Sequence, residues 1–156
     1  MSTIIHLDST RATEAAGGLL AQNIRAEAID SLVIYLIGDL GAGKTTFARG
    51  FLRGLGHAGR VPSPTYTLIE PYDVKNYAVS HIDLYRLQSA DEAEALALAE
   101  LCGSGTIMLI EWPENGGTGV PPADLRVELN IDGQGRRLCL SGSRSLEALL
   151  KRQINL

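Results

Sequence analysis

The sequence has few cysteines and no long hydrophobic run, and each shortage excludes a class of protein. Its two cysteines, Cys102 and Cys139, are far apart and form no C-x-x-C pair. We therefore expect both to pack in or near the core rather than to bind a metal or form a disulfide. No apolar run approaches the ~20 residues of a membrane span. The N-terminus also lacks a basic-then-apolar signal pattern, so we expect a cytoplasmic protein with no membrane partner.

An excess of positive charge is missing as well. The chain carries 14 Lys and Arg against 18 Asp and Glu, a net charge of −4, and it has no basic tail. This balance argues against a protein that binds nucleic acid tightly on its own. The length of 156 residues suits one domain with a real core. Because we find no internal repeat and no linker, we predict a single domain over residues 1–156.

The most informative stretch is GDLGAGKT at residues 38–45, which matches G-x-x-x-x-G-K-[ST] at every fixed position. Its glycines allow a tight loop to bring backbone N–H groups to a phosphate chain without Cβ clashes. Lys44 then reaches the β- and γ-phosphates, and the Thr45 hydroxyl can ligate Mg²⁺. The residues predicted to surround the phosphates are Gly41, Ala42, Gly43, Lys44 and Thr45.

The flanking residues favour a true phosphate loop over a glycine turn that merely links two elements. Residues 32–37 are a nearly unbroken apolar run that predicts a strand buried on both faces. Apolar residues at 47, 48, 51, 52 and 55 then recur at helical spacing. Strand, loop and helix in this order deliver phosphate to a helix N-terminus, where free N–H groups favour an anion.

The remaining pattern predicts an α/β protein with a three-layer domain like that of phosphate-loop NTPases. We expect a mostly parallel central sheet with antiparallel additions and a C-terminal β-hairpin. Two glycines at 17 and 18 weaken the first helix by ~1 kcal/mol each. The other expected elements are strands at 4–7, 66–72, 77–85, 106–110, 125–131 and 136–141, helices at 10–24, 89–101 and 146–151, and a mobile loop at 114–122.

Three further segments supply candidate catalytic groups. Prolines hold residues 60–67 extended, so that Thr65 lies on a loop that either closes over the γ-phosphate or is an ordinary surface connection. Alternation places His81 and Asp83 on one strand face, either as a hydrogen-bonded polar pair or with Asp83 addressing the attacking water or the metal shell. The apolar strand 106–110 ends on Glu111, an acid placed to hold Mg²⁺ together with Thr45.

Aromatic and cationic residues near these segments leave alternatives open. Trp112 is a packing residue, a wall of the nucleotide pocket or an anchor for a partner. Arg136 and Arg86 either reach the site as charge-neutralising cations or are ordinary surface arginines. A solvated helix face explains the shared spacing of arginines at 49 and 53 and a histidine at 57, and an interface for an acidic partner or RNA is the alternative.

Four motifs together resemble the TsaE (YjeE) family, the small ATPases of bacterial threonylcarbamoyladenosine synthesis in tRNA. They are GDLGAGKTT at 38–46, SPTYT at 63–67, HIDLYRL at 81–87 and IEWP at 110–113. The first is generic, but the last three in this order are specific. One departure is that residues 95–102 lack a glycine and an aromatic residue that relatives tend to carry, which concerns local packing or a partner contact.

The resemblance implies a Mg²⁺- and ATP-binding enzyme with weak ATPase activity alone. It implies partners TsaB and TsaD, and tRNA only indirectly through that complex. By the same resemblance Thr45 and Glu111 are the Mg²⁺ ligands, Asp83 is an acid needed for activity, and Thr65 lies in a switch loop. Thr46 extends the phosphate loop, Arg136 matches a nucleotide-contacting arginine, and Thr10 aligns with a segment lining the nucleotide. The rival functions are a small-molecule or nucleotide kinase and a nucleotide-dependent binding module.

Overall fold

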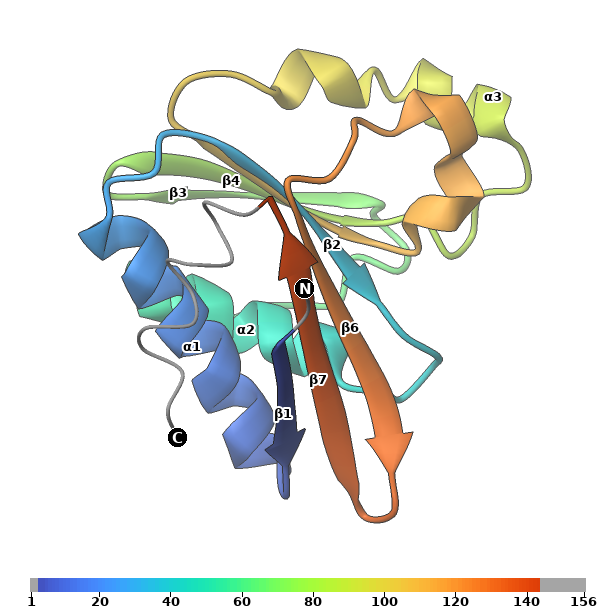
Figure 1. Ribbon diagram of the computed structural model, residues 1–156. Coiled ribbons are helices and arrows are strands. Elements are labelled where there is room, and N and C mark those ends of the chain that lie inside the picture. Colours follow the sequence, from blue (N-terminus) through green and yellow to red (C-terminus); the bar gives the residue numbers. More distant parts are fainter. Residues whose placement is uncertain (1–2, 144–156) are drawn as a thin grey trace.

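The computed structural model describes residues 3–143, which form one seven-stranded sheet with helical segments on both faces (Figure 1). None of the helices in this range is long and apolar enough to cross a membrane. The elements are β1 (Thr3–Leu7), α1 (Thr10–Ala26), β2 (Leu32–Ile37), α2 (Lys44–Leu55), β3 (Ile69–Val74), β4 (Tyr77–Asp83), α3 (Ala90–Ala95), η1 (Leu98–Leu101), β5 (Thr106–Glu111), η2 (Pro113–Gly119), β6 (Leu125–Asp132) and β7 (Gly135–Gly142). The expected helix at 146–151 lies outside the described residues.

The sheet has the order β1-β7-β6-β2-β5-β4-β3, and its four central strands run parallel. β1, β7 and β3 pair antiparallel at the edges, and β6 with β7 forms the predicted hairpin. These findings confirm the predicted α/β class. Because β2, β4 and β5 are parallel neighbours, their carboxyl ends meet at one sheet edge, and Asp83 lies in register with Glu111 there.

On one face of the sheet, α1 crosses α2 through direct backbone contact (Figure 1). A Cβ built on Gly17 would lie 2.2 Å from the carbonyl oxygen of Phe47, and one on Gly50 would lie 1.9 Å from that of Glu14. Both distances are far inside van der Waals contact, so this crossing requires glycine. The glycines that weaken α1 by propensity therefore permit the close packing that fixes α2.

The helix predicted over 89–101 is wrong beyond Ala95. The chain breaks at Ala97, which adopts left-handed backbone (φ 51°), and resumes as the short η1. Leu96 and Leu98 both pack on the apolar cluster beneath, although two residues of a continuous helix point ~200° apart. Tertiary packing thus overrides helix propensity here.

The expected loop at 114–122 is instead largely the short helical segment η2, which packs against α3. The side-chain amide of Asn115 donates to the carbonyl oxygens of Leu84 and Tyr85 at 3.1 and 3.3 Å. η2 thereby braces the chain immediately after β4. Both cysteines are free of disulfides, as predicted, and Cys139 is half-buried. Cys102 is exposed rather than packed in the core, although its thiol lies 3.4 Å from the sulfur of the buried Met108.

The strand predicted over 66–72 begins only at Ile69. Residues 64–67 form a turn, closed by the N–H of Leu68 donating to the carbonyl oxygen of Pro64 at 2.8 Å, and Leu68 is left-handed (φ 66°). The strand expected to reach Tyr85 ends at Asp83. Residues 60–63 therefore have no regular secondary structure, and residues 64–67 fold into a turn before the chain meets the end of β4 through the N–H of Asp83, which donates to the carbonyl oxygen of Leu68 at 2.9 Å.

Candidate active site

The phosphate loop joins the carboxyl end of β2 to the N-terminus of α2. Gly41 and Gly43 adopt left-handed backbone (φ 78° and 105°), which favours glycine at these two positions. Gly43 caps α2 with its carbonyl, which accepts from the N–H of Phe47 at 2.9 Å. The first turn of α2 consequently presents its free N–H groups at the loop, as an anion site requires.

A hollow of 330 Å³ beside the loop brings together most of the predicted site residues. It is lined by residues 40–46, Ser63, Thr65, Asp83, Tyr85, Glu111 and Trp112. A second hollow of 260 Å³ shares Gly41, Gly43 and Thr46 with the first and is lined on its far side by Ser9, Thr10, Thr13, Gln134, Gly135 and Arg136. A larger hollow of 740 Å³ continues from Arg136 and contains neither Asp83 nor Glu111. The predicted residues therefore divide between two adjoining hollows.

Lys44 is folded back over its own loop. Its ammonium group donates to the carbonyl oxygens of Gly38 and Asp39 and lies 3.8 Å from the centroid of the Trp112 ring. Burial lowers the pKa of Lys44, and the nearby Glu111 and other carboxylates oppose that shift. The indole thus covers the lysine, a contact that the sequence pattern did not indicate, and it forms part of the wall of the hollow, one of the three alternatives for Trp112.

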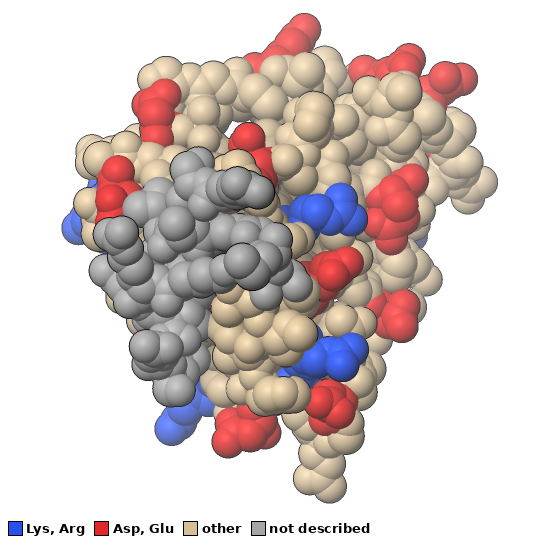
Figure 2. Space-filling view, in the orientation of Figure 1, with Lys and Arg blue, Asp and Glu red and all other residues tan. Residues whose placement is uncertain are grey.

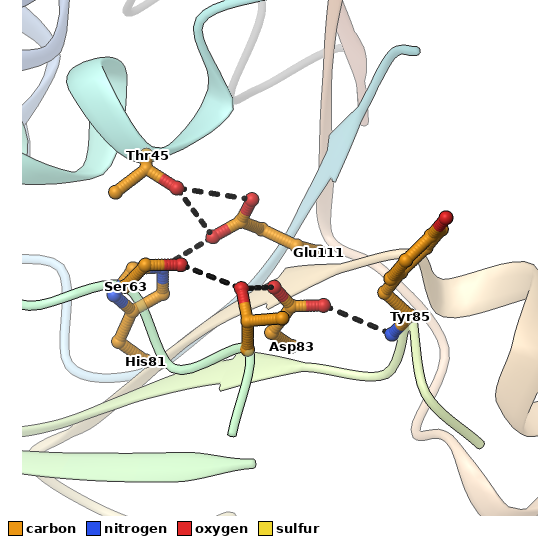
Figure 3. Close-up of polar contacts among 7 residues, drawn as sticks. Thr45, Ser63, His81, Asp83, Tyr85 and Glu111 are labelled. Carbon is orange, nitrogen blue, oxygen red and sulfur yellow. Dashed lines mark hydrogen bonds and ion pairs between the residues drawn. The ribbon is translucent and has the colours of Figure 1, made fainter. Parts of the chain in front are cut away.

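Thr45, His81 and Glu111 converge from three different elements, α2, β4 and β5 (Figure 3). The Thr45 hydroxyl lies 3.4 Å from each carboxylate oxygen of Glu111. Nε2 of His81 lies 2.7 Å from Oε2 of Glu111, and both side chains are almost fully buried. Among residues 3–143 no group of three or more His, Cys, Asp or Glu side chains is arranged to hold a metal. The hydroxyl and carboxylate nevertheless fit Mg²⁺, which favours oxygen ligands and keeps waters and phosphates as the others.

Asp83 is held from two sides at the end of β4 (Figure 3). It accepts a hydrogen bond from the Thr65 hydroxyl at 3.2 Å and one from the N–H of Tyr85 at 2.9 Å. The Thr65 hydroxyl also lies 2.7 Å from that of Ser63. Burial raises the pKa of Asp83, and the Glu111 carboxylate raises it further, against the lowering effect of the two hydrogen bonds. His81 is not the partner of Asp83, since its bond runs to Glu111.

The predicted cations occupy positions that the sequence could not specify. Arg136 donates from Nε to the carbonyl oxygen of Ala42 at 3.0 Å and from Nη2 to that of Gly41 at 2.9 Å, so it holds the phosphate loop from outside. Arg86 lies over the exposed ring of Tyr66, 4.0 Å from its centroid. On the face shown in Figure 2, acidic and basic side chains of the described residues are interspersed and form no continuous basic patch.

Two of the three residues predicted to share a face of the phosphate-loop helix have contacts within the chain, although α2 ends at Leu55 and His57 lies beyond it. Arg53 forms an ion pair with Glu14 of α1. His57 packs edge-on against the ring of Tyr72, with the ring centroids 4.8 Å apart. Arg53 remains half-exposed in this ion pair, which is compatible with the predicted solvated helix face, and neither contact tests the alternative of an interface.

Comparison with known proteins gives one consistent result. The family model described as "Threonylcarbamoyl adenosine biosynthesis protein TsaE" matches residues 7–139. The tRNA threonylcarbamoyladenosine biosynthesis protein TsaE of Haemophilus influenzae is 42% identical over 116 residues, 74% of this chain and 73% of that protein. The protein of the same name from Rickettsia felis is 34% identical over 145 residues, 92% and 82% of the two chains. The crystal structure of Bacillus subtilis YdiB superposes with a TM-score of 0.76 at 28% identity, covering 97% of this chain and 95% of that one.

Proposed function

The chain belongs to the TsaE family, and on that premise we propose that it is a Mg²⁺-dependent ATPase serving threonylcarbamoyladenosine modification of tRNA. The family match over residues 7–139 includes every residue that lines the two hollows beside the phosphate loop. Membership in a family named for threonylcarbamoyladenosine biosynthesis supports a role of this protein in that pathway. The chemistry assigned to the site rests on its geometry.

The observation that carries the ATPase proposal is the meeting of Thr45 and Glu111 beside Lys44 and the glycine loop. Phosphoryl transfer depends mostly on positioning and on neutralising charge at the transferred group. The loop N–H groups and the first turn of α2 bind the phosphates, and Lys44 leaves its loop carbonyls to contact the β- and γ-phosphates. Thr45 and Glu111 would hold Mg²⁺, which would neutralise phosphate charge.

The nucleoside would occupy the second hollow, and its phosphates the first, with the chain passing over Gly41 and Gly43. Thr10 and Thr46 line this route. Arg136 would act here by donating to the carbonyl oxygens of Gly41 and Ala42, which holds the phosphate loop in its shape. Trp112 closes the first hollow over Lys44.

Asp83 is the proposed acceptor that orients the attacking water. It is buried, stands in register with Glu111 and still reaches the hollow together with the Thr65 hydroxyl. A carboxylate with a raised pKa is suited to general-base work nearer neutral pH than an ordinary aspartate. Thr65 then links the water-positioning acid to the loop at 63–67.

The proposed partners are TsaB and TsaD, with tRNA bound only through that complex, and the proposed location is therefore the cytoplasm. A partner-dependent enzyme is supported by the exposure of the loop at the hollow, where Tyr66 is 80% exposed. Indirect contact with tRNA is supported by the net charge of −4 and by the interspersed charges on the face shown in Figure 2.

Phosphate release with and without TsaB, TsaD and tRNA tests this function. We expect weak hydrolysis alone and stimulation by the partners. Lys44→Ala should abolish hydrolysis and lower the affinity for Mg-ATP, because it removes the ammonium group held at the loop. Lys75→Ala, at an exposed lysine of the β3–β4 turn, is the matched control. Parental hydrolysis by Lys44→Ala, or phosphate appearing on an added metabolite, would contradict the proposal.

A further inference from the structure

We propose that His81 is a positioning residue that fixes the orientation of the Glu111 carboxylate towards Thr45. This role rests on the proposed Mg-ATP site and adds a residue to it. His81 is fully buried, and its Nε2 approaches Oε2 of Glu111 to 2.7 Å across two parallel strands. The contact links the interior of β4 to the carboxylate at the end of β5 (Figure 3).

Strand register explains how the ring reaches the carboxylate. Asp83 pairs with Glu111, and His81 pairs with Leu109, one pleat further from the sheet edge. Residues two apart on a strand share a face, so the imidazole extends along that face to Glu111 from below. Thr45 approaches the same carboxylate from the N-terminus of α2. Glu111 therefore lies between a histidine of the sheet and a threonine of the phosphate loop.

The two contacts differ in strength. The Thr45 hydroxyl lies 3.4 Å from both carboxylate oxygens, at the outer limit of hydrogen bonding. The His81 contact is short and involves a buried carboxylate, which makes it the firm anchor of Glu111 among the described residues. His81 holds Oε2 of Glu111 in place. Because the Thr45 contacts are long, the Thr45 hydroxyl and Oε1 of Glu111 remain available to bind a cation.

The second ring nitrogen distinguishes this role from ordinary packing. Nε2 is the ring nitrogen that faces the carboxylate, and it donates there when it carries a proton. Nδ1 is buried and has no hydrogen-bond partner within residues 3–143. An apolar side chain would fill this position without burying an unsatisfied atom. The bond that Nε2 makes to Glu111 explains why a histidine occupies this buried position.

Three substitutions separate the effect of the hydrogen-bond donor from that of the ring volume. His81→Leu has a similar size but no donor. His81→Gln carries an amide N–H at about the reach of Nε2, whereas His81→Asn reaches only as far as Nδ1. The readout is Mn²⁺ affinity, measured by electron paramagnetic resonance in the presence of a non-hydrolysable ATP analogue. Affinity for the analogue in EDTA is measured alongside, because it reports the nucleotide site without metal.

We expect His81→Leu to weaken Mn²⁺ binding about ten-fold or more, the usual effect of losing a partner of a metal ligand. Affinity for the analogue in EDTA should stay at the parental level, and His81→Gln should restore most of the Mn²⁺ affinity. His81→Asn should behave like His81→Leu and supplies the test if the leucine variant does not fold. In a Glu111→Gln background, His81→Leu should weaken Mn²⁺ binding no further, because its effect passes through Glu111.

Three results would overturn the role of His81. They are parental Mn²⁺ affinity in both His81→Leu and His81→Asn, failure of His81→Gln to restore binding, and full additivity with Glu111→Gln. A parental protein that binds no Mn²⁺ with the analogue would instead overturn the proposed function. The two failures are therefore distinguished by the parental measurement alone.

Discussion

The active site has two halves that differ in how firmly the fold holds them. The fixed half consists of Lys44, Thr45, His81 and Glu111, whose elements are α2, β4 and β5. The loop half consists of Ser63 and Thr65 in the segment between α2 and β3. Lys44, His81 and Glu111 are at most 5% exposed, while Ser63 is exposed and Thr65 is half-buried. Asp83 joins the halves, since it ends β4 and accepts a hydrogen bond from Thr65.

The difference indicates which part of the site can respond to the nucleotide. α2 meets α1 backbone to backbone at Gly17 and Gly50, so the fixed half cannot shift without moving both helices. The loop half is joined to the rest of the site by the Thr65–Asp83 hydrogen bond and the Arg86–Tyr66 contact. ATP and ADP differ only by the γ-phosphate, so the two nucleotides can shift the population of loop conformations only if these conformations differ little in free energy. We infer that the fixed half binds the nucleotide and that the loop half changes conformation according to whether the γ-phosphate is present.

The strongest test of this comparison is Glu111→Gln in the fixed half. Glutamine keeps the size but loses the charge, so we expect a ~100–1,000-fold loss of turnover, typical of removing one electrostatic contact to a transition state. The Mg²⁺ requirement should also weaken. Phosphate release over a Mg²⁺ titration measures both, and Glu100→Gln, at an exposed acid on η1, is the matched control. Parental turnover in Glu111→Gln would remove the metal role from the fixed half.

Asp83→Asn tests the residue where the halves meet. Its proposed task belongs to the transition state, so we expect turnover to fall ~10–100-fold with nucleotide affinity nearly unchanged. Isothermal titration with a non-hydrolysable analogue and steady-state phosphate release separate the two quantities. Equal losses of nucleotide affinity in Asp83→Asn and Glu111→Gln would contradict the division between binding and turnover.

The fixed half was largely predictable from sequence, because local patterns specify it. The apolar run at 32–37, the glycine loop and the helical spacing after it are contiguous, and the structure has β2 and α2 there. Glu111 was predicted from an apolar strand that ends in an acid. The His81–Glu111 bond was missed because it depends on the register of two strands 30 residues apart in sequence.

Other features were missed because they depend on contacts between distant elements. Arg136 was expected at the nucleotide, and its bonds to the carbonyls of Gly41 and Ala42 depend on the placement of the β6–β7 hairpin. The break at Ala97 follows from packing on the sheet, not from local propensity. Asn115 bracing the end of β4 carries no local signal at all.

Thr65→Val tests whether the loop half couples ATP binding to association with the partners. Valine keeps the shape but removes the hydroxyl that bonds Asp83, so we expect near-parental ATP binding with loss of ATP-dependent association with TsaB and TsaD. Allosteric couplings are typically ~1–3 kcal/mol, or about 5–150-fold in affinity. Thr67→Val, at an exposed hydroxyl of the same loop, is the matched control. Hydrogen exchange over residues 60–70 follows the loop directly, and identical exchange with ADP and with the ATP analogue in the presence of partners would make this segment a plain connection.

The smallest expected effect is on the free energy of unfolding of the nucleotide-free protein, and it comes from the buried charge of Asp83. Burial raises the pKa of this carboxyl, so the folded state takes up its proton more readily than the unfolded state does. The ionised form therefore destabilises the fold at pH values above that raised pKa, and this cost is relieved as the pH falls through it. The Asp83→Asn substitution removes the charge but keeps a side-chain oxygen that can accept from the N–H of Tyr85, because only one of the two acceptors becomes an amide.

We therefore expect Asp83→Asn to be more stable than the parent at neutral pH, although it turns over more slowly. A gain of about 0.5–2 kcal/mol is usual where an active-site group is held at a cost to stability. For a protein of this size each kcal/mol raises Tm by about 2–4 °C. Thermal unfolding without nucleotide, from about pH 8 to about pH 5, should show the advantage shrink as the pH falls. A variant that is less stable than the parent at neutral pH, or an advantage that grows towards acid pH, would mean that the hydrogen bonds from Thr65 and Tyr85 outweigh the cost of burying the charge.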